Sequence, residues 1–185
     1  MRLHFSLVAI FCLAFSLTAH AQSNEFAAEA SGLLNVSPYH PGAGVGFQLN
    51  YAHRLFHVPL VSIYGEVPFV AGFDNTQYVL TQLTRENYNA FYVTPGVKVK
   101  FAPGFIVSPY LAAGVGVAHF SSTQNNSSDT QFAADWGGGL DFKVLPFVSL
   151  RLEARDFYSG VPTLILPTTG NQNNIVVSGG LVLRF

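Results

Sequence analysis

The chain has 185 residues, of which 49% are hydrophobic, 14% aromatic and only 10% charged, and its formal net charge at pH 7 is -1. This length fits a single domain. So much apolar and aromatic surface with so little charge excludes an intrinsically disordered protein. Basic and acidic residues number 9 and 10, which leaves no excess positive charge for phosphates, so no nucleic-acid partner is expected.

The first segment has the features of a secretion signal. Arg2 precedes an almost unbroken apolar run over residues 7–17, and the Ala-His-Ala sequence at 19–21 matches a cleavage site. The apolar run is shorter than the roughly 20 residues that a membrane-spanning helix needs. We therefore predict that residues 1–21 are a cleaved signal peptide and that residues 22–185 form the mature domain.

Eight segments of the mature chain alternate apolar and polar residues with the period of a β-strand. They are Glu25–Leu33, Ala43–Leu55, Leu60–Gly72, Asn89–Phe101, Ile106–Phe120, Phe132–Lys143, Phe147–Gly160 and Asn174–Phe185. Most are about as long as a tilted strand that crosses a bilayer. The pattern predicts an all-β protein, an eight-stranded antiparallel up-and-down barrel that spans a membrane.

The connections between these segments alternate in length. The long ones, at 34–42, 73–88, 121–131 and 161–173, are rich in Asn, Gln, Ser and Thr, and the short ones lie at 56–59, 102–105 and 144–146. Outer-membrane barrels have short periplasmic turns and longer extracellular loops. An even number of strands then places both termini on the periplasmic side.

The clearest alternation lies in the segment from Phe147 to Gly160. Leu150 and Leu152 share one face, and Arg151, Glu153 and Arg155 share the other. A soluble lipocalin-like binder would turn the apolar face toward a ligand cavity, whereas a membrane barrel would turn it toward lipid.

Nearly all cations of the mature chain fall on the polar rows of the predicted strands. Assigning these rows to one interior gathers seven cations and five anions: Arg54, Lys98, Lys100, Lys143, Arg151, Arg155 and Arg184 with Glu29, Glu66, Asp135, Asp141 and Glu153. An eight-stranded barrel is just wide enough for side chains to fill it. We therefore predict a lumen network of paired charges, with Glu29, Glu66, Lys98, Lys100, Asp135, Asp141, Lys143, Arg151, Glu153 and Arg155 as its members, rather than the selective pore of a small porin.

Aromatic residues cluster near both ends of the strands, as in the two girdles of a membrane barrel. One band contains Phe56, Phe101, Phe105, Phe142, Phe147 and Phe185, and the other contains Phe69, Phe73, Phe91, Phe120, Phe132, Phe157 and Tyr158. Cross-strand aromatic pairs in a soluble sheet would not require two opposed bands.

Three stretches carry a resemblance to a known family: Trp136–Lys143, Leu150–Arg155 and the terminal Ser178–Phe185. The sequence resembles the small eight-stranded outer-membrane barrels of Gram-negative bacteria, the OmpA-like and opacity-protein-like outer membrane protein beta-barrel domains. The resemblance implies that outer-membrane lipid and lipopolysaccharide surround the protein. It also implies that Phe185, with Leu183 and Leu181 before it, is the signal read by the barrel-assembly machinery.

The family's activities vary, so the resemblance implies location rather than a reaction. No peptidoglycan-binding domain follows Phe185, and the anchoring role of longer relatives is therefore not expected. We expect a structural or surface-interaction protein that acts through its long loops, with an extracellular ligand that the sequence does not identify.

Catalysis, cofactors and metals are not expected from the remaining motifs. His53 and His57 have a metal-ligand spacing but not the helix that would bring both rings together. A Ser-His-Asp set could assemble at the outer rim from Ser121, His119 and Asp156, as in a lipid-modifying barrel enzyme. Small polar residues are common at the base of loops, so the interpretation as a non-enzyme is preferred.

Overall fold

The computed structural model describes residues 23–36, 42–79, 84–122, 128–160 and 171–185. The predicted signal peptide, residues 1–21, lies outside the described residues. Within the described ranges nearly every residue is in a β-strand, which confirms the predicted all-β fold. None of these ranges contains a helix long and apolar enough to cross a membrane.

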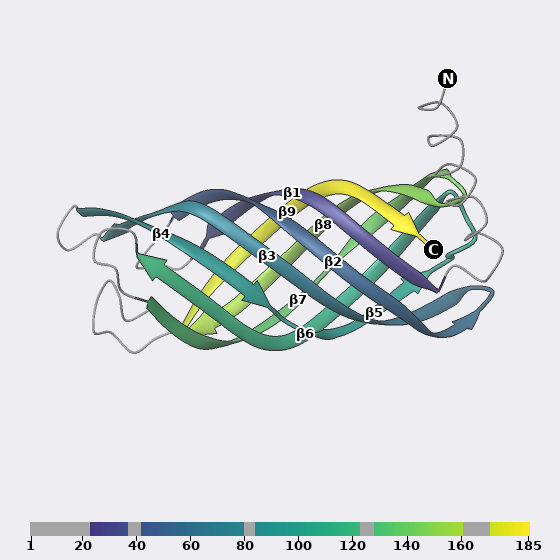
Figure 1. Ribbon diagram of the computed structural model, residues 1–185, viewed down its shortest axis with the longest axis horizontal. Coiled ribbons are helices and arrows are strands. Elements are labelled where there is room, and N and C mark those ends of the chain that lie inside the picture. Colours follow the sequence, from purple (N-terminus) through teal and green to yellow (C-terminus); the bar gives the residue numbers. More distant parts are fainter. Residues whose placement is uncertain (1–22, 37–41, 80–83, 123–127, 161–170) are drawn as a thin grey trace, which may run out of the picture.

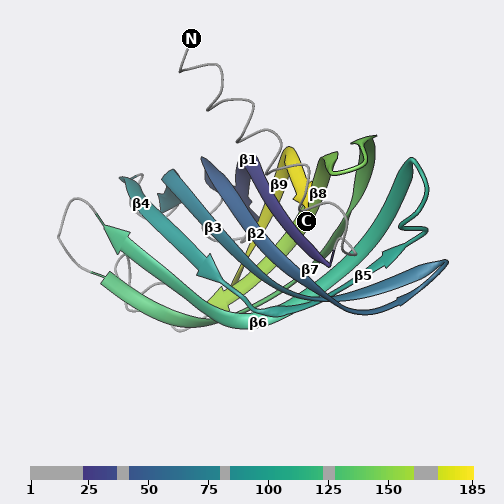
Figure 2. The same ribbon diagram turned by 45° about the vertical axis from the view of Figure 1, so that its right-hand side comes forward.

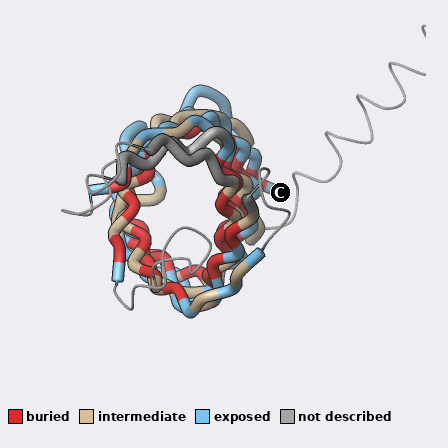
Figure 3. The backbone as a smooth tube through the Cα atoms, turned by 90° about the vertical axis from the view of Figure 1, so that its left-hand side faces the viewer, coloured by how far each residue is buried: buried red, intermediate tan, exposed pale blue. Residues whose placement is uncertain are grey.

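The strands form one antiparallel sheet that closes on itself (Figure 1). They are β1 (Asn24–Asn35), β2 (Gly42–Val58), β3 (Val61–Val79), β4 (Thr84–Val93), β5 (Gly96–Phe101), β6 (Val107–Ser122), β7 (Ser128–Leu145), β8 (Val148–Gly160) and β9 (Asn171–Arg184). β1 pairs with β2 on one side and with β9 on the other, and this pairing closes the barrel. Viewed along the axis, the backbone forms a ring (Figure 3). The strands run at a slant around it, as closure requires (Figure 2).

β4 and β5 are two parts of a single barrel strand. Each pairs with β3 on one side and with β6 on the other. The ladder is interrupted at Thr94 and Pro95, where the proline has no N–H to donate, although its carbonyl accepts from Val115 N at 3.1 Å. The nine strands therefore occupy eight positions, and the predicted eight-stranded antiparallel up-and-down barrel is confirmed.

The two ends of the barrel differ. At one end, here called the turn end, lie Asn24, the terminal Phe185 and the turns that follow β2, β5 and β7 (Figure 1). At the other, here called the loop end, β1, β3, β6 and β8 end and β2, β4, β7 and β9 begin. The residues that join these strands, 37–41, 80–83, 123–127 and 161–170, fall outside the described residues. The first and last strands thus begin and end at the turn end, where Asn24 and Phe185 exchange two backbone hydrogen bonds, as an even number of strand positions requires.

Two of the predicted loops are shorter than expected because the strands continue into them. The expected loop 73–88 is largely strand, with pairs from Asn75↔Tyr88 to Val79↔Thr84, and the expected loop 121–131 narrows to the connection after Ser122. Backbone N–H and C=O groups sustain an antiparallel ladder whatever side chains it carries. Polar sequence was therefore a poor guide to where pairing stops.

The two faces of the strands have opposite environments. On β8 the residues Arg151 and Glu153 are 1% and 3% exposed, whereas Leu150 and Leu152 are 48% and 58% exposed. The charged row thus faces the lumen and the apolar row covers the outside. This is the polarity of a membrane barrel and the reverse of a soluble lipocalin-like binder, so that alternative is wrong.

An apolar layer fills the lumen toward the loop end. This apolar plug consists of Leu33, Val70, Ala90, Tyr92, Ala118, Phe120, Ala133, Phe157 and Val176. The Tyr92 ring centroid lies 4.9 Å from that of Phe157 and 6.0 Å from that of Phe120. Phe120 and Phe157 were expected in the outer aromatic band, and this was wrong: both are 0% exposed inside the barrel. Phe157 lies on the same inward row of β8 as Arg155. That row changes from charged to apolar side chains near the loop end.

Candidate functional site: the charged lumen

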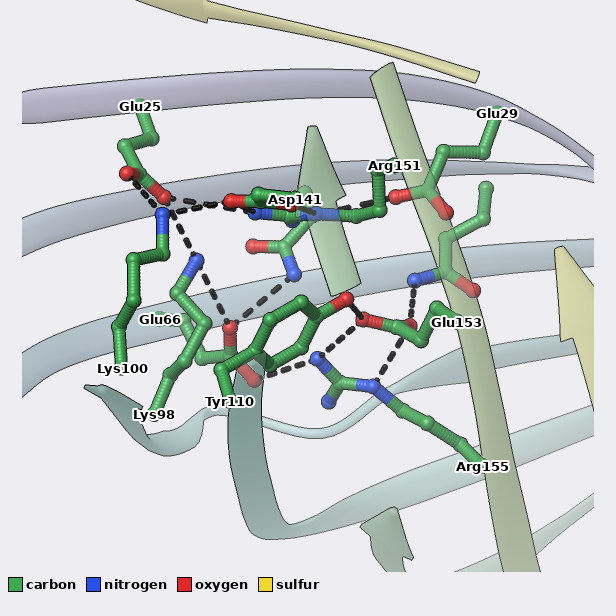
Figure 4. Close-up of polar contacts among 12 residues, drawn as sticks. Glu25, Glu29, Glu66, Lys98, Lys100, Tyr110, Asp141, Arg151, Glu153 and Arg155 are labelled. Carbon is green, nitrogen blue, oxygen red and sulfur yellow. Dashed lines mark hydrogen bonds and ion pairs between the residues drawn. The ribbon is translucent and has the colours of Figure 1, made fainter. Parts of the chain in front are cut away.

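The part of the lumen between the apolar plug and the turn end is filled by charged side chains (Figure 4). Eleven of them form what we call the lumen network: Glu25, Glu29, Glu66, Lys98, Lys100, Asp135, Asp141, Arg151, Glu153, Arg155 and Arg184. None is more than 8% exposed. They reach the axis from β1, β3, β5, β7, β8 and β9, so the network joins strands from all around the barrel.

Glu25 of β1 is the carboxylate shared by most cations near the turn end. Its oxygens lie 3.0 Å from Lys98 Nζ, 3.3 Å from Arg184 Nε and 3.4 Å from Arg151 Nη2, and it also pairs with Lys100. One buried carboxylate thus faces four cations. Burying it would be costly without them, because an unpaired charge loses its hydration.

Asp141 of β7 is the second acceptor for the same cations. Arg151 donates to it through two nitrogens, at 2.7 and 3.0 Å, which is the bidentate geometry that makes guanidinium and carboxylate pairs strong. Lys100 Nζ lies 2.6 Å and Arg184 Nη2 3.5 Å from Oδ2 of the same carboxylate, which Arg151 Nη2 also contacts.

Arg155 of β8 organises the deeper half of the network. Its guanidinium donates to Glu66 at 2.6 Å, to Glu153 at 2.7 Å and to Asp135 at 2.8 Å. Three carboxylates thus depend on one cation, which makes Arg155 the residue whose loss leaves the most buried charge unpaired.

Neutral side chains complete the network. Gln48 and the Tyr110 hydroxyl both donate to Glu153, Asn50 donates to Glu66 at 3.1 Å, and the Tyr110 ring lies 4.8 Å from the Arg151 guanidinium carbon. These contacts satisfy lone pairs that the cations do not reach, and they place an aromatic face beneath a cation.

Glycines on the inward rows leave space for these long side chains. A Cβ atom at Gly139 would lie 2.3 Å from the Leu152 carbonyl oxygen and 2.5 Å from the Tyr110 hydroxyl, and one at Gly137 would lie 2.2 Å from the Ala154 carbonyl oxygen and 2.9 Å from Cγ of Arg155. Such separations are far below van der Waals contact, so a larger residue at either position would displace both the β8 backbone and the network.

The structure brings most of the predicted lumen residues together. Glu29, Glu66, Lys98, Lys100, Asp135, Asp141, Arg151, Glu153 and Arg155 all belong to the network. Lys143 does not: its side chain is exposed at the turn end and makes no ion pair with any described residue. The inward row of β7 leaves the enclosed lumen at that point, and Asp141 is its last buried member.

Glu25 is the network member that sequence reasoning missed. It lies four residues before Glu29 and therefore on the same face of β1, opposite the Ala28 row. That period-two signal was present in the sequence.

The rim residues considered for catalysis do not come together. His119 pairs with Thr130 of β7, and its ring Nδ1 lies 2.8 Å from Thr130 Oγ1. Asp156 pairs with Trp136, six residues further along β7, and accepts from Asn173 at 2.9 Å. At about 3.3 Å per residue this separates His119 and Asp156 by about 20 Å. Ser121 therefore has no His-Asp pair to activate it.

The proposed assembly signal lies on the outer face of β9. Leu181, Leu183 and Phe185 are 51%, 47% and 48% exposed, at the end where β9 pairs with β1. Their role as a recognition signal for the assembly machinery stays a prediction.

Most charges of the network are paired with one another, although Glu29 Oε1, Asp135 Oδ1, Arg151 Nη1 and Arg184 Nε make no hydrogen bond. Within the described ranges no group of three or more His, Cys, Asp or Glu side chains is arranged to hold a metal ion. What the arrangement does is tie β1, β3, β5, β7, β8 and β9 together across the axis and fill the space through which a solute would pass.

Comparison with known proteins places this architecture in a family. The outer membrane protein beta-barrel domain matches residues 7–185, nearly the whole chain. No curated protein matches the chain significantly.

Several solved structures share the fold. That of Neisserial surface protein A (NspA) has a TM-score of 0.68 at 16% identity, covering 88% of this chain and 97% of that one. OprG from Pseudomonas aeruginosa has a TM-score of 0.54 at 8% identity, covering 88% and 95%, and the outer membrane enzyme PagL has 0.52 at 17% identity, covering 85% and 99%. Identities this low show the fold and not the activity. The closed barrel, its apolar outer face and the family match together show that this chain belongs to the outer membrane protein beta-barrel domain family and resides in the bacterial outer membrane.

Proposed function

We propose that this protein is a closed, non-catalytic barrel that serves the outer membrane as a structural and surface-interaction protein through the four connections at its loop end. The observation that carries the proposal is the filled lumen. The lumen network closes the turn-end half and the apolar plug closes the loop-end half, with Lys98, Tyr92 and Phe157 each no more than 1% exposed. A barrel that no solute can pass through cannot act in transport through its lumen, so its exposed surfaces are left to carry its function.

The small-porin alternative would need a water-filled path along the axis. In this barrel Arg155, Glu153 and Glu66 meet across the lumen, and Tyr92 packs against Phe120 and Phe157 beyond them. An ion would have to displace both layers. The ion pairs are held from several strands at once, so this displacement is expected to be rare.

Conductance in planar lipid bilayers tests the closed lumen. Purified protein that shifts in mobility on boiling, and is therefore folded, is expected to give no stepwise currents, whereas an open trimeric porin in the same bilayers provides the positive control. Regular steps that grow with salt concentration would show a path through the network and would reject the closed barrel in favour of a small porin.

The lipid-modifying alternative has less support from the geometry. His119, the histidine that this alternative requires, is hydrogen-bonded to Thr130. Asp156, its carboxylate, accepts from Asn173 at another level of the barrel. PagL shares the fold at a TM-score of 0.52, but that likeness does not extend to a reaction.

A surface role also requires that the loop end face the exterior. The chain's one cysteine, Cys12, lies in the predicted signal peptide. A single cysteine introduced into the mature chain is therefore expected to be the only thiol there that a maleimide can label. On intact cells a large polyethylene-glycol maleimide is expected to label Ser128→Cys at the loop end and to leave Gly104→Cys at the turn end unlabelled until the outer membrane is permeabilised. A side chain at Gly104 meets no atom within 4 Å, so this variant should fold. The opposite pattern would reverse the orientation and remove the basis of the proposal.

A further inference from the structure

A cavity of about 210 Å³ opens at the turn end and borders the lumen network. Its lining residues are Arg54, His57, Tyr64, Lys100, Pro103, Gly104, Lys143 and Arg184. Four of them are Lys or Arg, one is His, and none is Asp or Glu. The volume is several times the roughly 30 Å³ that one molecule of liquid water occupies, so a small solute group fits.

The positive charge at this cavity is only partly balanced by the carboxylates of the described residues. Lys100 and Arg184 are paired with Glu25 and Asp141, but these two carboxylates also serve Lys98 and Arg151. Two carboxylates, Glu25 and Asp141, are thus shared among four cations. The other two cations of the cavity lining add further positive charge.

Those remaining two, Arg54 and Lys143, make no ion pair with any described residue. Arg54 is half-buried on β2 and Lys143 is exposed on β7, so they approach the cavity from different strands. Arg184 adds a buried donor: its Nε lies 3.3 Å from Glu25 Oε1 but makes no hydrogen bond there. Unpaired cations and an unsatisfied buried donor around one cavity are what an anion site requires.

We propose that this cavity, which we call the basic mouth, binds a phosphate group presented from the turn-end side of the membrane. Two guanidinium groups and two ammonium groups converge on it, and guanidinium forks match the oxygens of a phosphate. His57 lies in the same lining, with its Nδ1 2.7 Å from Ser62 Oγ, so the ring is held in place.

The surroundings of the mouth indicate two sources for this phosphate. The turns at this end carry exposed apolar side chains, among them Leu60, Phe105, Ile106 and Val144 at 65%, 62%, 74% and 59% exposed. Figure 2 shows the β2–β3 and β5–β6 hairpins reaching out at this end. A rim of this kind lies at the lipid interface, so the first source is the headgroup of a phospholipid. The rim is also open to the aqueous phase, so the second source is a soluble phosphate compound.

Phosphorus NMR titration of the folded protein in dodecyl maltoside, a detergent without phosphate, tests the proposal. Inorganic phosphate is the first probe and dihexanoyl phosphatidylglycerol, below its micelle concentration, the second. Arg54→Gln and Lys143→Gln are each expected to weaken binding about tenfold, as the loss of one charge-assisted hydrogen bond predicts. Neither residue has an ion pair with a described residue to lose, so both variants should keep the mobility shift on boiling.

Arg85→Gln is the matched control, because Arg85 pairs with Tyr78 at the loop end and its replacement removes the same charge far from the cavity. It is expected to leave both affinities unchanged. Binding of both probes, weakened by Arg54→Gln and Lys143→Gln, supports recognition of the phosphate group itself, and binding of one probe alone identifies its source. Absence of binding by both probes, or binding that Arg85→Gln weakens as much as Lys143→Gln does, would overturn the proposal.

Discussion

Replacing Arg155 with leucine is expected to lower the free energy of unfolding by about 3 to 5 kcal/mol, the cost of removing one partner from a buried ion pair. Arg155 is 2% exposed and donates to Glu66, Asp135 and Glu153. Leucine would fill part of the space but leave three carboxylates facing one another without their cation. Lys98, 3.6 Å from Glu66, could compensate only one of them.

Urea unfolding of the protein in lipid vesicles, followed by tryptophan fluorescence of Trp136, measures this loss. Lys143→Leu is the matched control, since it removes a cation from an inward row but no ion pair with a described residue, and it is expected to change stability little. Arg155→Lys should recover part of the loss, because it restores the charge without the guanidinium fork. Equal stability of Arg155→Leu and Lys143→Leu would show that the lumen network does not stabilise the barrel.

Replacing Leu152 with arginine is expected to cost about 2 to 4 kcal/mol or to block membrane assembly, because a cation on the lipid face near the midplane loses its hydration. Leu152 is 58% exposed on the outer face, beside Leu140 of β7 and Gly179 of β9. It lies in the middle of β8, remote from both rims.

Assembly is followed by fractionation of the outer membrane and by the mobility shift on boiling. Leu152→Ala serves as the control, because it trims an apolar side chain on the same face without adding charge, and it is expected to assemble normally. If both variants assembled equally well, the outer face of β8 would not contact lipid, and the assignment of the two faces would be wrong.

The sequence alone determined the architecture and the location. Strict alternation in β8 identified two faces, and the concentration of cations on one row of each strand indicated which face is enclosed. Period-two patterns are local, since neighbouring residues of a strand point to opposite faces whatever lies across the barrel. The closed barrel, the eight strand positions and the inward placement of Lys98, Arg151 and Arg155 were therefore predictable.

Only the tertiary structure decided which groups meet and where each layer begins. Glu25, near the start of the chain, contacts Lys98, Lys100 and Arg184 because strand tilt and register bring them to one level, and no local pattern carries that information. The same register separates His119 from Asp156 along β7. It also places Phe120 and Phe157 around Tyr92, and it leaves Arg54 and Lys143 at the basic mouth instead of in the network. A strand's face follows from its own sequence, whereas the height of a side chain in the barrel depends on how all the strands are staggered against one another.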